Sequence, residues 1–467
     1  MHFGEAIDGP HTWRQSDTAH YIWDYYQSDI NLMEPSVCWM GGNDKVALEF
    51  PLPEAIAAVI HKVMGPSLIW SRLFFFLIYL AGAYYFYQIL RIVAPEGLAR
   101  LTVLLYMSLP LGLFYSRAIH VDFSAVLCAH GMLYFALVSI RKLSMPHFLI
   151  SMVFATIGFL IKAPYLFFLA LPLMAFAIRE RKFVFLLKNA IWLVFPIGLF
   201  LLWQVHVRKL NGAMPDWSFI PQYHKMDDMS GWYFGDIKHR FEGFLWEILF
   251  DRLKFGLAAV TGLPVLIAGI NLGWKRFHSN FMRLWLFGAV IYLLIFFTLN
   301  VIHDYYQIPF LVPLAYFVAL PIYYIYRAAE RFNRKIAFAL ATIAFLIIAG
   351  QSLRLTEGYA LSEAEKKHFG GYYKVNELVY GAGQVIRAHT PEESLVITTF
   401  GGLDCRCPNL LYASRRKGWS IPKQDISVDI VQKLQSNNAS HYALLQVEPL
   451  SDSLEAYLKQ FLSLIHI

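Results

Sequence analysis

The sequence is short of charged residues, which make up only 16% of its 467 residues, whereas 57% are hydrophobic. Soluble domains usually carry about a quarter charged residues. The mean hydropathy of +0.45 points the same way. This composition excludes an ordinary soluble enzyme and predicts a polytopic α-helical membrane protein.

Sequence motifs of several large enzyme classes are also missing. No stretch matches a phosphate-binding P-loop, a Rossmann glycine fingerprint, a zinc protease motif or a serine-hydrolase elbow. The four cysteines form no CxxC pair, and Cys405 and Cys407 are too close together to bridge without strain. The net charge of +7 does not indicate nucleic-acid binding, because orientation in a membrane already requires basic loops.

Apolar runs of membrane-crossing length dominate the chain after the first 66 residues. We predict ten spans, at about 67–91, 101–116, 123–140, 147–162, 164–181, 184–206, 255–273, 282–300, 306–326 and 336–352. Lys and Arg clusters fall at alternate ends of these spans, which assigns all of the clusters to the cytoplasmic side. Residues 1–66, the turn near 116–122, the loop 207–254 and the tail are then expected outside.

An outside start raises a question about translocation, because residues 1–66 contain no signal peptide. We therefore expect one further apolar span upstream of Met1, and about eleven spans in all. The domains predicted within this chain are a first extracytoplasmic loop with an amphipathic helix (1–66), a transmembrane domain (67–352) and an extracytoplasmic α/β domain (353–467). In the last of these, 395–400 and 442–447 have the pattern of buried strands.

The loop at residues 8–19 is the densest group of chemically useful side chains in the sequence. Asp8 and Asp17 are candidate general bases for an acceptor hydroxyl. Arg14 offers a planar fork of donors suited to a phosphate. Further candidate ligands of a substrate in this loop are His11, Trp13 and Gln15. The alternative is that Asp8 and Asp17 are ordinary loop or helix-cap residues.

Two other groups lie at predicted outer ends of spans. One comprises Arg117, His120 and Asp122, and an acid at the start of an apolar span usually has a partner or a role. The other group comprises His303, Tyr305 and Tyr306, to which Lys162 adds a cation. The alternatives are a capping Asp122–Arg117 pair and tyrosines that only anchor the membrane interface.

These motifs, in this order, resemble one family of membrane glycosyltransferases. The segments are His11-x-Trp13-Arg14-Gln15-x-Asp17, then Glu49-Phe50-Pro51, Arg117 with Asp122, and His303-Asp-Tyr305-Tyr306. They are similar to the dolichyl-phosphate-mannose-protein mannosyltransferase-like enzymes of the GT-C superfamily, which include aminoarabinose transferases and protein O-mannosyltransferases.

The resemblance implies transfer of a sugar from a polyprenyl-phosphate donor to a lipid, glycan or protein hydroxyl. The implied location is the outer face of a bacterial cytoplasmic membrane. Acidic residues of the first and second outer loops, here Asp17 or Asp8 and Asp122, are implied to be catalytic. Better-known relatives have an Asp-Glu pair where this chain has Arg14-Gln15, so the identity of the base stays open, with Glu49 as a third candidate. The resemblance implies no particular cofactor, and a divalent metal stays open as a candidate because relatives differ in metal dependence.

A flippase or transporter for lipid-linked saccharides is the alternative function. Transporters tend to carry paired interrupted helices in two matching halves and polar groups near the bilayer centre. Here the polar groups gather at one face and no internal repeat is evident. The sequence therefore favours a transferase.

Overall fold

The fold was determined as a computed structural model that describes residues 2–42, 44–223, 225–400, 406–445, 452–461 and 463–466. Cys405 and the end of the predicted strand 442–447 lie outside these residues. The chain divides into two units. The first unit comprises 1–71, 203–228 and 374–467, and the second comprises 72–202 and 229–373.

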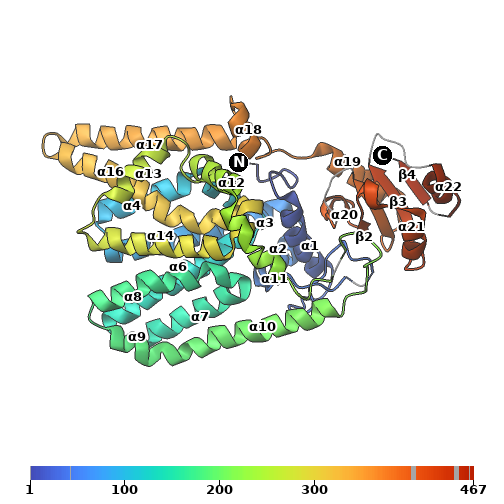
Figure 1. Cartoon of the computed structure of the whole chain (residues 1–467), viewed down its shortest axis with the longest axis horizontal. Helices are drawn as coiled ribbons and strands as arrows, with labels where there is room; N and C mark the ends of the chain where they lie inside the picture. Colours follow the sequence, from blue (N-terminus) through green and yellow to red (C-terminus); the bar gives the residue numbers. More distant parts are fainter. Residues whose placement is uncertain are drawn as a thin grey trace. The chain divides into compact units, whose positions relative to one another are not determined.

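The first unit combines the N-terminal helices with a small sheet. Its helices are α1 (Thr12–Gln27), α2 (Leu52–Met64), α19 (Glu377–His389), α20 (Asn409–Ser414), α21 (Val428–Gln435) and α22 (Asp452–Phe461). Its strands are β1 (Leu395–Phe400), β2 (Lys417–Ser420), β3 (Ala439–Leu445) and β4 (Ser463–His466). They form one parallel sheet in the order β2-β1-β3-β4 (Figure 1). The predicted C-terminal α/β fold is confirmed.

Local sequence explains where the two N-terminal helices begin. His11, with φ of 58°, turns the chain immediately before α1. Proline at Pro51 and Pro53 fixes backbone angles that suit the first turn of α2, where no intrahelical N–H bond is lost. The predicted amphipathic helix is confirmed as α2. The alternative in which Asp17 caps a helix is wrong, because α1 begins five residues earlier.

The second unit is a helical bundle. Its main helices are α3 (Leu68–Val93), α4 (Glu96–Ser108), α5 (Pro110–Tyr115), α6 (Asp122–Lys142), α7 (Met145–Lys162), α8 (Ala170–Arg179), α9 (Phe183–Asn189), α11 (Ser230–Phe234), α12 (Gly243–Arg252), α13 (Gly262–Asn271), α14 (Phe277–Ile295), α15 (Phe297–Ile302), α16 (Leu311–Glu330), α17 (Arg334–Thr356) and α18 (Glu363–Phe369). Helix α10 (Val194–Gly212) and the start of α3 contribute residues to both units. Glycine allows close packing: a Cβ on Gly158 of α7 would lie 2.9 Å from Cys128 Cβ of α6.

Seven helices of the described residues are long and apolar enough to cross a membrane, or eight if α12 and α13 form one bent span. The predicted polytopic architecture is confirmed, and seven of the ten predicted runs match these helices. The other three are shorter. The run 101–116 breaks before Pro110 into α4 and α5, and 164–181 contains only the apolar helix 167–179. The run 255–273 bends by 100° between α12 and α13.

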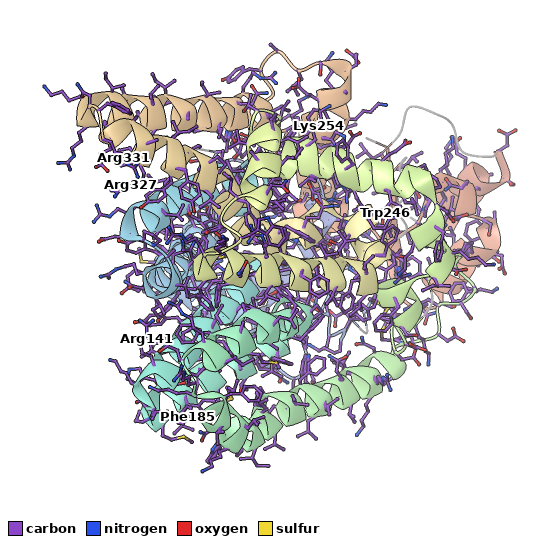
Figure 2. All side chains as sticks on the ribbon, turned by 60° about the vertical axis from the view of Figure 1, so that its left-hand side comes forward. Arg141, Phe185, Trp246, Lys254, Arg327 and Arg331 are labelled. Carbon is purple, nitrogen blue, oxygen red and sulfur yellow. The ribbon has the colours of Figure 1, made fainter. Side chains whose placement is uncertain are left out.

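Basic side chains gather at one end of the second unit. Arg141 donates to the Ile92 carbonyl and lies 3.7 Å from Glu180, so the ends of α3, α6 and α8 meet there. Arg179 lies over the Phe277 ring at the start of α14. Figure 2 shows Arg141, Arg327 and Arg331 at this same end. Helices that run in alternate directions therefore bring their basic ends together, as the charge pattern predicts.

Candidate active site

The first-unit cluster, which we define as Arg14, Asp17, Trp39, Glu49 and Glu54, surrounds the buried face of α1. Asp17 accepts a hydrogen bond from Trp39 Nε1 at 2.9 Å, and Arg14 Nη2 pairs with Glu49 Oε2. Asp17 is 2% exposed and Arg14 5%. Burial of charged groups is costly unless they are paired, so charged side chains on the buried face of a helix are unusual.

Burial changes the proton affinity of two acids in the first-unit cluster. It raises the pKa of Asp17 from its ordinary 3.8 to about 7, while Arg14 and the Trp39 hydrogen bond limit the rise. Burial likewise raises the pKa of Glu54 from 4.5 to about 8, and its Oε2 has no hydrogen-bond partner among the described residues. A carboxyl with a pKa near neutrality is suited to accept and release a proton.

Other predicted residues of the opening loop have different positions. Gln15 Nε2 donates to the Asp8 backbone carbonyl at 2.7 Å. Asp8 also pairs through its backbone with Val375 as an isolated antiparallel bridge. His11 and Trp13 are half-buried at the start of α1. Asp8 and Gln15 thus help to hold the loop against the segment that leads into α19.

A charged contact joins β2 to the N-terminal segment within the first unit. Lys417 lies 3.3 Å from Asp24 and also pairs with Asp44. Burial alone would lower the pKa of Lys417, but Asp44 and Asp24 raise it. Burial and then Lys417 lower the pKa of the nearby His20 to about 3. The Lys417 cation, shared between two carboxylates, therefore connects the sheet to the N-terminal segment.

The second-unit cluster centres on Asp122, the first residue of α6. Its Oδ1 accepts hydrogen bonds from Lys162 Nζ at 2.8 Å and from the Tyr165 hydroxyl. Its Oδ2 lies 2.7 Å from His120 Nδ1. Asp122 is 1% exposed and Lys162 7%. We define the second-unit cluster as Asp122, Lys162, His120 and Tyr165.

Two tyrosine rings cover the cation of this cluster. Lys162 Nζ is 4.1 Å from the ring centre of Tyr306 and 5.2 Å from that of Tyr305, within the range of cation–π attraction. The His120 ring lies 4.5 Å from the Tyr305 ring, and His303 stacks on Tyr305 at 5.0 Å. The structure therefore brings together His120, Asp122 and Lys162 with the segment His303–Tyr306.

Tyrosine hydroxyls fix the segment 303–306. Tyr115 and Tyr372 donate to the two oxygens of Asp304 at 2.6 and 2.5 Å. Tyr165 donates to the Tyr305 carbonyl, and Tyr292 donates to the Tyr306 carbonyl at 2.8 Å. Sequence reasoning missed these partners because a tyrosine in an apolar run looks the same whether it anchors the interface or holds a site.

Arg117 has aromatic neighbours on two sides. Its guanidinium lies 4.5 Å from the Tyr373 ring centre and 5.5 Å from that of Phe114. The side chain is 4% exposed. Stacking of this kind suits the planar guanidinium, and it keeps the group oriented.

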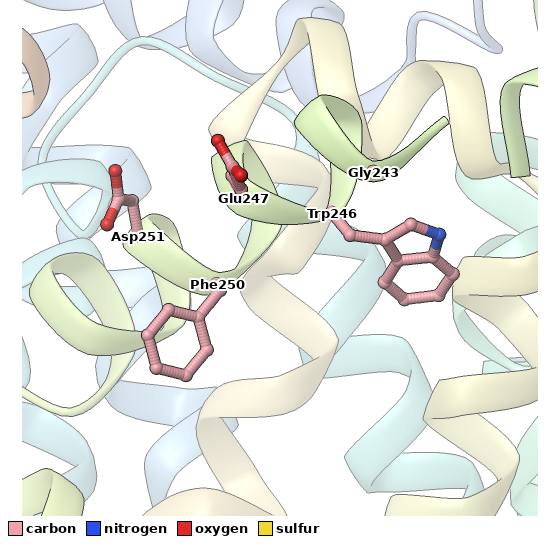
Figure 3. A pocket seen from close by; sticks show the side chains of 5 residues that line it. All are labelled: Gly243, Trp246, Glu247, Phe250 and Asp251. Atoms are coloured by element: carbon pink, nitrogen blue, oxygen red, sulfur yellow. The ribbon is translucent and has the colours of Figure 1, made fainter. Parts of the chain in front are cut away.

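A pocket of about 460 Å³ lies along one face of α12. Figure 3 shows its lining: Gly243, Trp246, Glu247, Phe250 and Asp251. Trp246 and Phe250 point to one side of the helix, and the two carboxylates point to the other. All lining residues belong to one helix. Substrate sites usually enclose the ligand between several elements, so this pocket does not compete with the two clusters.

The residues do not fit a metal centre. Among the described residues, no group of three or more His, Cys, Asp or Glu side chains is placed to hold a metal ion. In the first-unit cluster, the Glu49 carboxylate is paired with Arg14 and Asp17 accepts from Trp39.

Comparison with known proteins agrees with this architecture. Solved structures share the fold over nearly the whole chain. ArnT from Cupriavidus metallidurans bound to undecaprenyl phosphate aligns with a TM-score of 0.57 at 13% identity, covering 99% of this chain and 92% of that one. The apo form of the same protein aligns with a TM-score of 0.54 at 13% identity, covering 97% of this chain and 86% of that one. The archaeal oligosaccharyltransferase AglB from Archaeoglobus fulgidus aligns with a TM-score of 0.54 at 11% identity, covering 93% of this chain and 65% of that one. The fold is therefore GT-C-like, as in these solved structures.

Sequence comparison adds a family match over part of the chain. Residues 49–207 match the profile of the dolichyl-phosphate-mannose-protein mannosyltransferase family. No curated protein matches the sequence significantly. The resemblance expected from the motifs is confirmed, and the matched region includes Glu49, Asp122 and Lys162.

Proposed function

We propose that this protein is a glycosyltransferase that moves a sugar from a polyprenyl-phosphate donor to a hydroxyl of a lipid, glycan or protein. The proposed place is the outer face of the cytoplasmic membrane of a bacterium. The observation that carries the proposal is the buried, near-neutral Asp17 beside the Arg14–Glu49 pair in a GT-C-like fold. The solved relative with undecaprenyl phosphate supports the class of lipid carrier.

The proposed reaction needs a base, a site for the lipid phosphate and an acceptor hydroxyl. Asp17, in its ionised form, takes the proton of the acceptor hydroxyl. The acceptor oxygen forms a bond to the anomeric carbon, while the bond from that carbon to the phosphate oxygen breaks. The electron pair leaves with the lipid phosphate, which is released as a monoester. Each bond and proton is thereby accounted for without a further reactant.

The remaining candidates serve binding in this proposal. Cations suited to the developing phosphate charge are Arg14, Arg117, Lys162 and His303. The aromatic or amide side chains of His11, Trp13, Gln15, His120, Tyr305 and Tyr306 would contact the sugar or the lipid phosphate. Asp8 and Glu49 are the alternative bases. Asp17 is preferred because its pKa of about 7 lies near a working pH, where a general base is most effective.

The test follows a labelled polyprenyl-phosphate sugar in membranes that contain the protein. Consumption of the donor with release of free lipid phosphate supports a transferase. Movement of the intact donor across the bilayer without release contradicts it and indicates a flippase. A gene deletion, followed by mass spectrometry of surface glycans and lipids, identifies the acceptor by the one sugar that is missing.

A further inference from the structure

Both oxygens of the Asp122 carboxylate lie beside polar side chains of the second unit. Oδ1 accepts from Lys162 Nζ and the Tyr165 hydroxyl, and Oδ2 lies 2.7 Å from His120 Nδ1. The side chain is 1% exposed. A buried carboxylate in direct contact with an ammonium is suited to the role of a counter-ion.

The same carboxylate determines where the Lys162 ammonium lies. Lys162 leaves α7 as its last residue and turns its Nζ toward Asp122, beneath the rings of Tyr305 and Tyr306. A flexible lysine stem has many rotamers, and a fixed counter-ion selects one of them. Asp122 thereby sets the position of a cation that supports two tyrosine rings.

Tyr165 carries the connection to the backbone of the same segment. Its hydroxyl contacts both the Asp122 carboxylate and, at 3.1 Å, the Tyr305 carbonyl oxygen. One hydroxyl hydrogen cannot satisfy both acceptors at once, so Tyr165 links the two groups as a shared contact. The segment 303–306 thus depends on Asp122 through Lys162 and through Tyr165.

We propose that Asp122 is a positioning residue and not a catalytic carboxylate. It acts as the counter-ion that fixes Lys162 and, with Tyr165, orients the His303–Tyr306 segment toward the donor. The inference rests on the proposed function, since it assigns a role within that reaction. It also gives the two acids different roles: Asp17 remains the proposed base, and Asp122 positions groups of its own unit.

The experiment neutralises the pair one residue at a time and then together. Asp122→Asn alone and Lys162→Met alone each leave a buried charge without its partner, so both should lower the thermal midpoint and the transfer rate. The double variant removes both charges. We expect it to regain most of the thermal midpoint, while transfer stays reduced because the Lys162 cation is lost, and the pH profile of the remaining activity should match that of the unchanged protein.

The outcomes separate this inference from the proposed function. Loss of the acidic limb of the pH profile in the folded double variant would make Asp122 a catalytic carboxylate and overturn the inference. Failure of the double variant to regain stability would also overturn it, because the pair would then not be a counter-ion pair. Absence of transfer by the unchanged protein contradicts the proposed function, whereas the recovered midpoint still supports the counter-ion role.

A second variant tests the shared contact without a charge change. Tyr165→Phe removes only the hydroxyl and keeps the ring beside Lys162. We expect KM for the donor to rise several-fold with an unchanged pH profile, since a positioning residue does not supply the titrating base. A change in kcat of a hundredfold, or a shifted acidic limb of the pH profile, would contradict the positioning role. Tyr359→Phe, an exposed tyrosine of the same unit, is the matched control.

Discussion

The two acidic clusters are buried to the same degree but are compensated differently. Asp17 is 2% exposed and Asp122 1%. Asp17 accepts one hydrogen bond from a neutral indole, and its pKa is raised. Asp122 contacts an ammonium, an imidazole and a hydroxyl. A buried acid with a raised pKa is suited to exchange a proton, whereas a buried acid in contact with an ammonium is suited to act as a counter-ion. The comparison shows why two acids in one protein need not share a role.

The largest effect is expected from removal of the Asp17 carboxylate. Asp17→Asn keeps the size of the side chain but cannot accept a proton, so the transfer rate should fall by about 10²–10⁴-fold. The assay is release of lipid phosphate from the labelled donor. Asp29→Asn, an exposed acid just after α1, should retain full activity as the matched control. Near-normal turnover by Asp17→Asn would transfer the role of base to Asp8 or Glu49.

The same variant should also change how the stability of the protein depends on pH. In the folded state the pKa of Asp17 is about 7, compared with 3.8 ordinarily, so the folded protein binds more protons between these values and loses stability as pH rises through them. The two pKa values differ by an amount equivalent to about 4 kcal/mol. Asp17→Asn should therefore be more stable than the unchanged protein at pH 8 and similar at pH 4. Thermal melts in detergent at the two pH values measure the difference. Equal stabilities at pH 8 would contradict the raised pKa.

Loss of the Lys417 contact between the sheet and the N-terminal segment should have an intermediate effect on stability. Lys417→Met leaves Asp24 and Asp44 close together without their shared cation, and we expect a loss of about 1–3 kcal/mol. Lys433→Met removes an exposed i,i+4 partner of Asp429 and should cost less than about 0.5 kcal/mol. Thermal melts of both variants give the comparison. Equal effects would show that the Lys417 contact is no stronger than a surface ion pair.

Much of the architecture could be predicted, because hydrophobic length and basic flanks are local properties. The helices α3, α6, α7, α14 and α17 and the strand β1 follow this logic. Pro110 and the bend after α12 reduced the number of long spans, since a run of apolar residues does not reveal where a helix breaks. The motif residues Arg14, Asp17 and Glu49 were identified through charge density and resemblance.

The partners of these residues were harder to predict. Trp39 is 22 residues from Asp17, and Tyr165 is 43 residues from Asp122. Nothing in a single sequence indicates such distant contacts. Glu54 was missed for another reason: within the amphipathic α2 it looks like a solvated acid in the first turn, whereas it is 1% exposed.

The smallest effect concerns the hydroxyls that hold segment 303–306. Tyr372→Phe removes one of the two tyrosine hydroxyls that donate to Asp304, and the expected loss of stability is about 1 kcal/mol. Tyr115→Phe removes the other, and the double variant should cost more than the sum of the two, because Asp304 then loses both donors. If Asp304 only anchors the segment, the donor KM of each single variant should rise less than that of Tyr165→Phe, since Lys162 and Asp122 stay in contact. A larger rise for Tyr372→Phe would instead make Asp304 the main support of the segment and reduce the part assigned to Asp122.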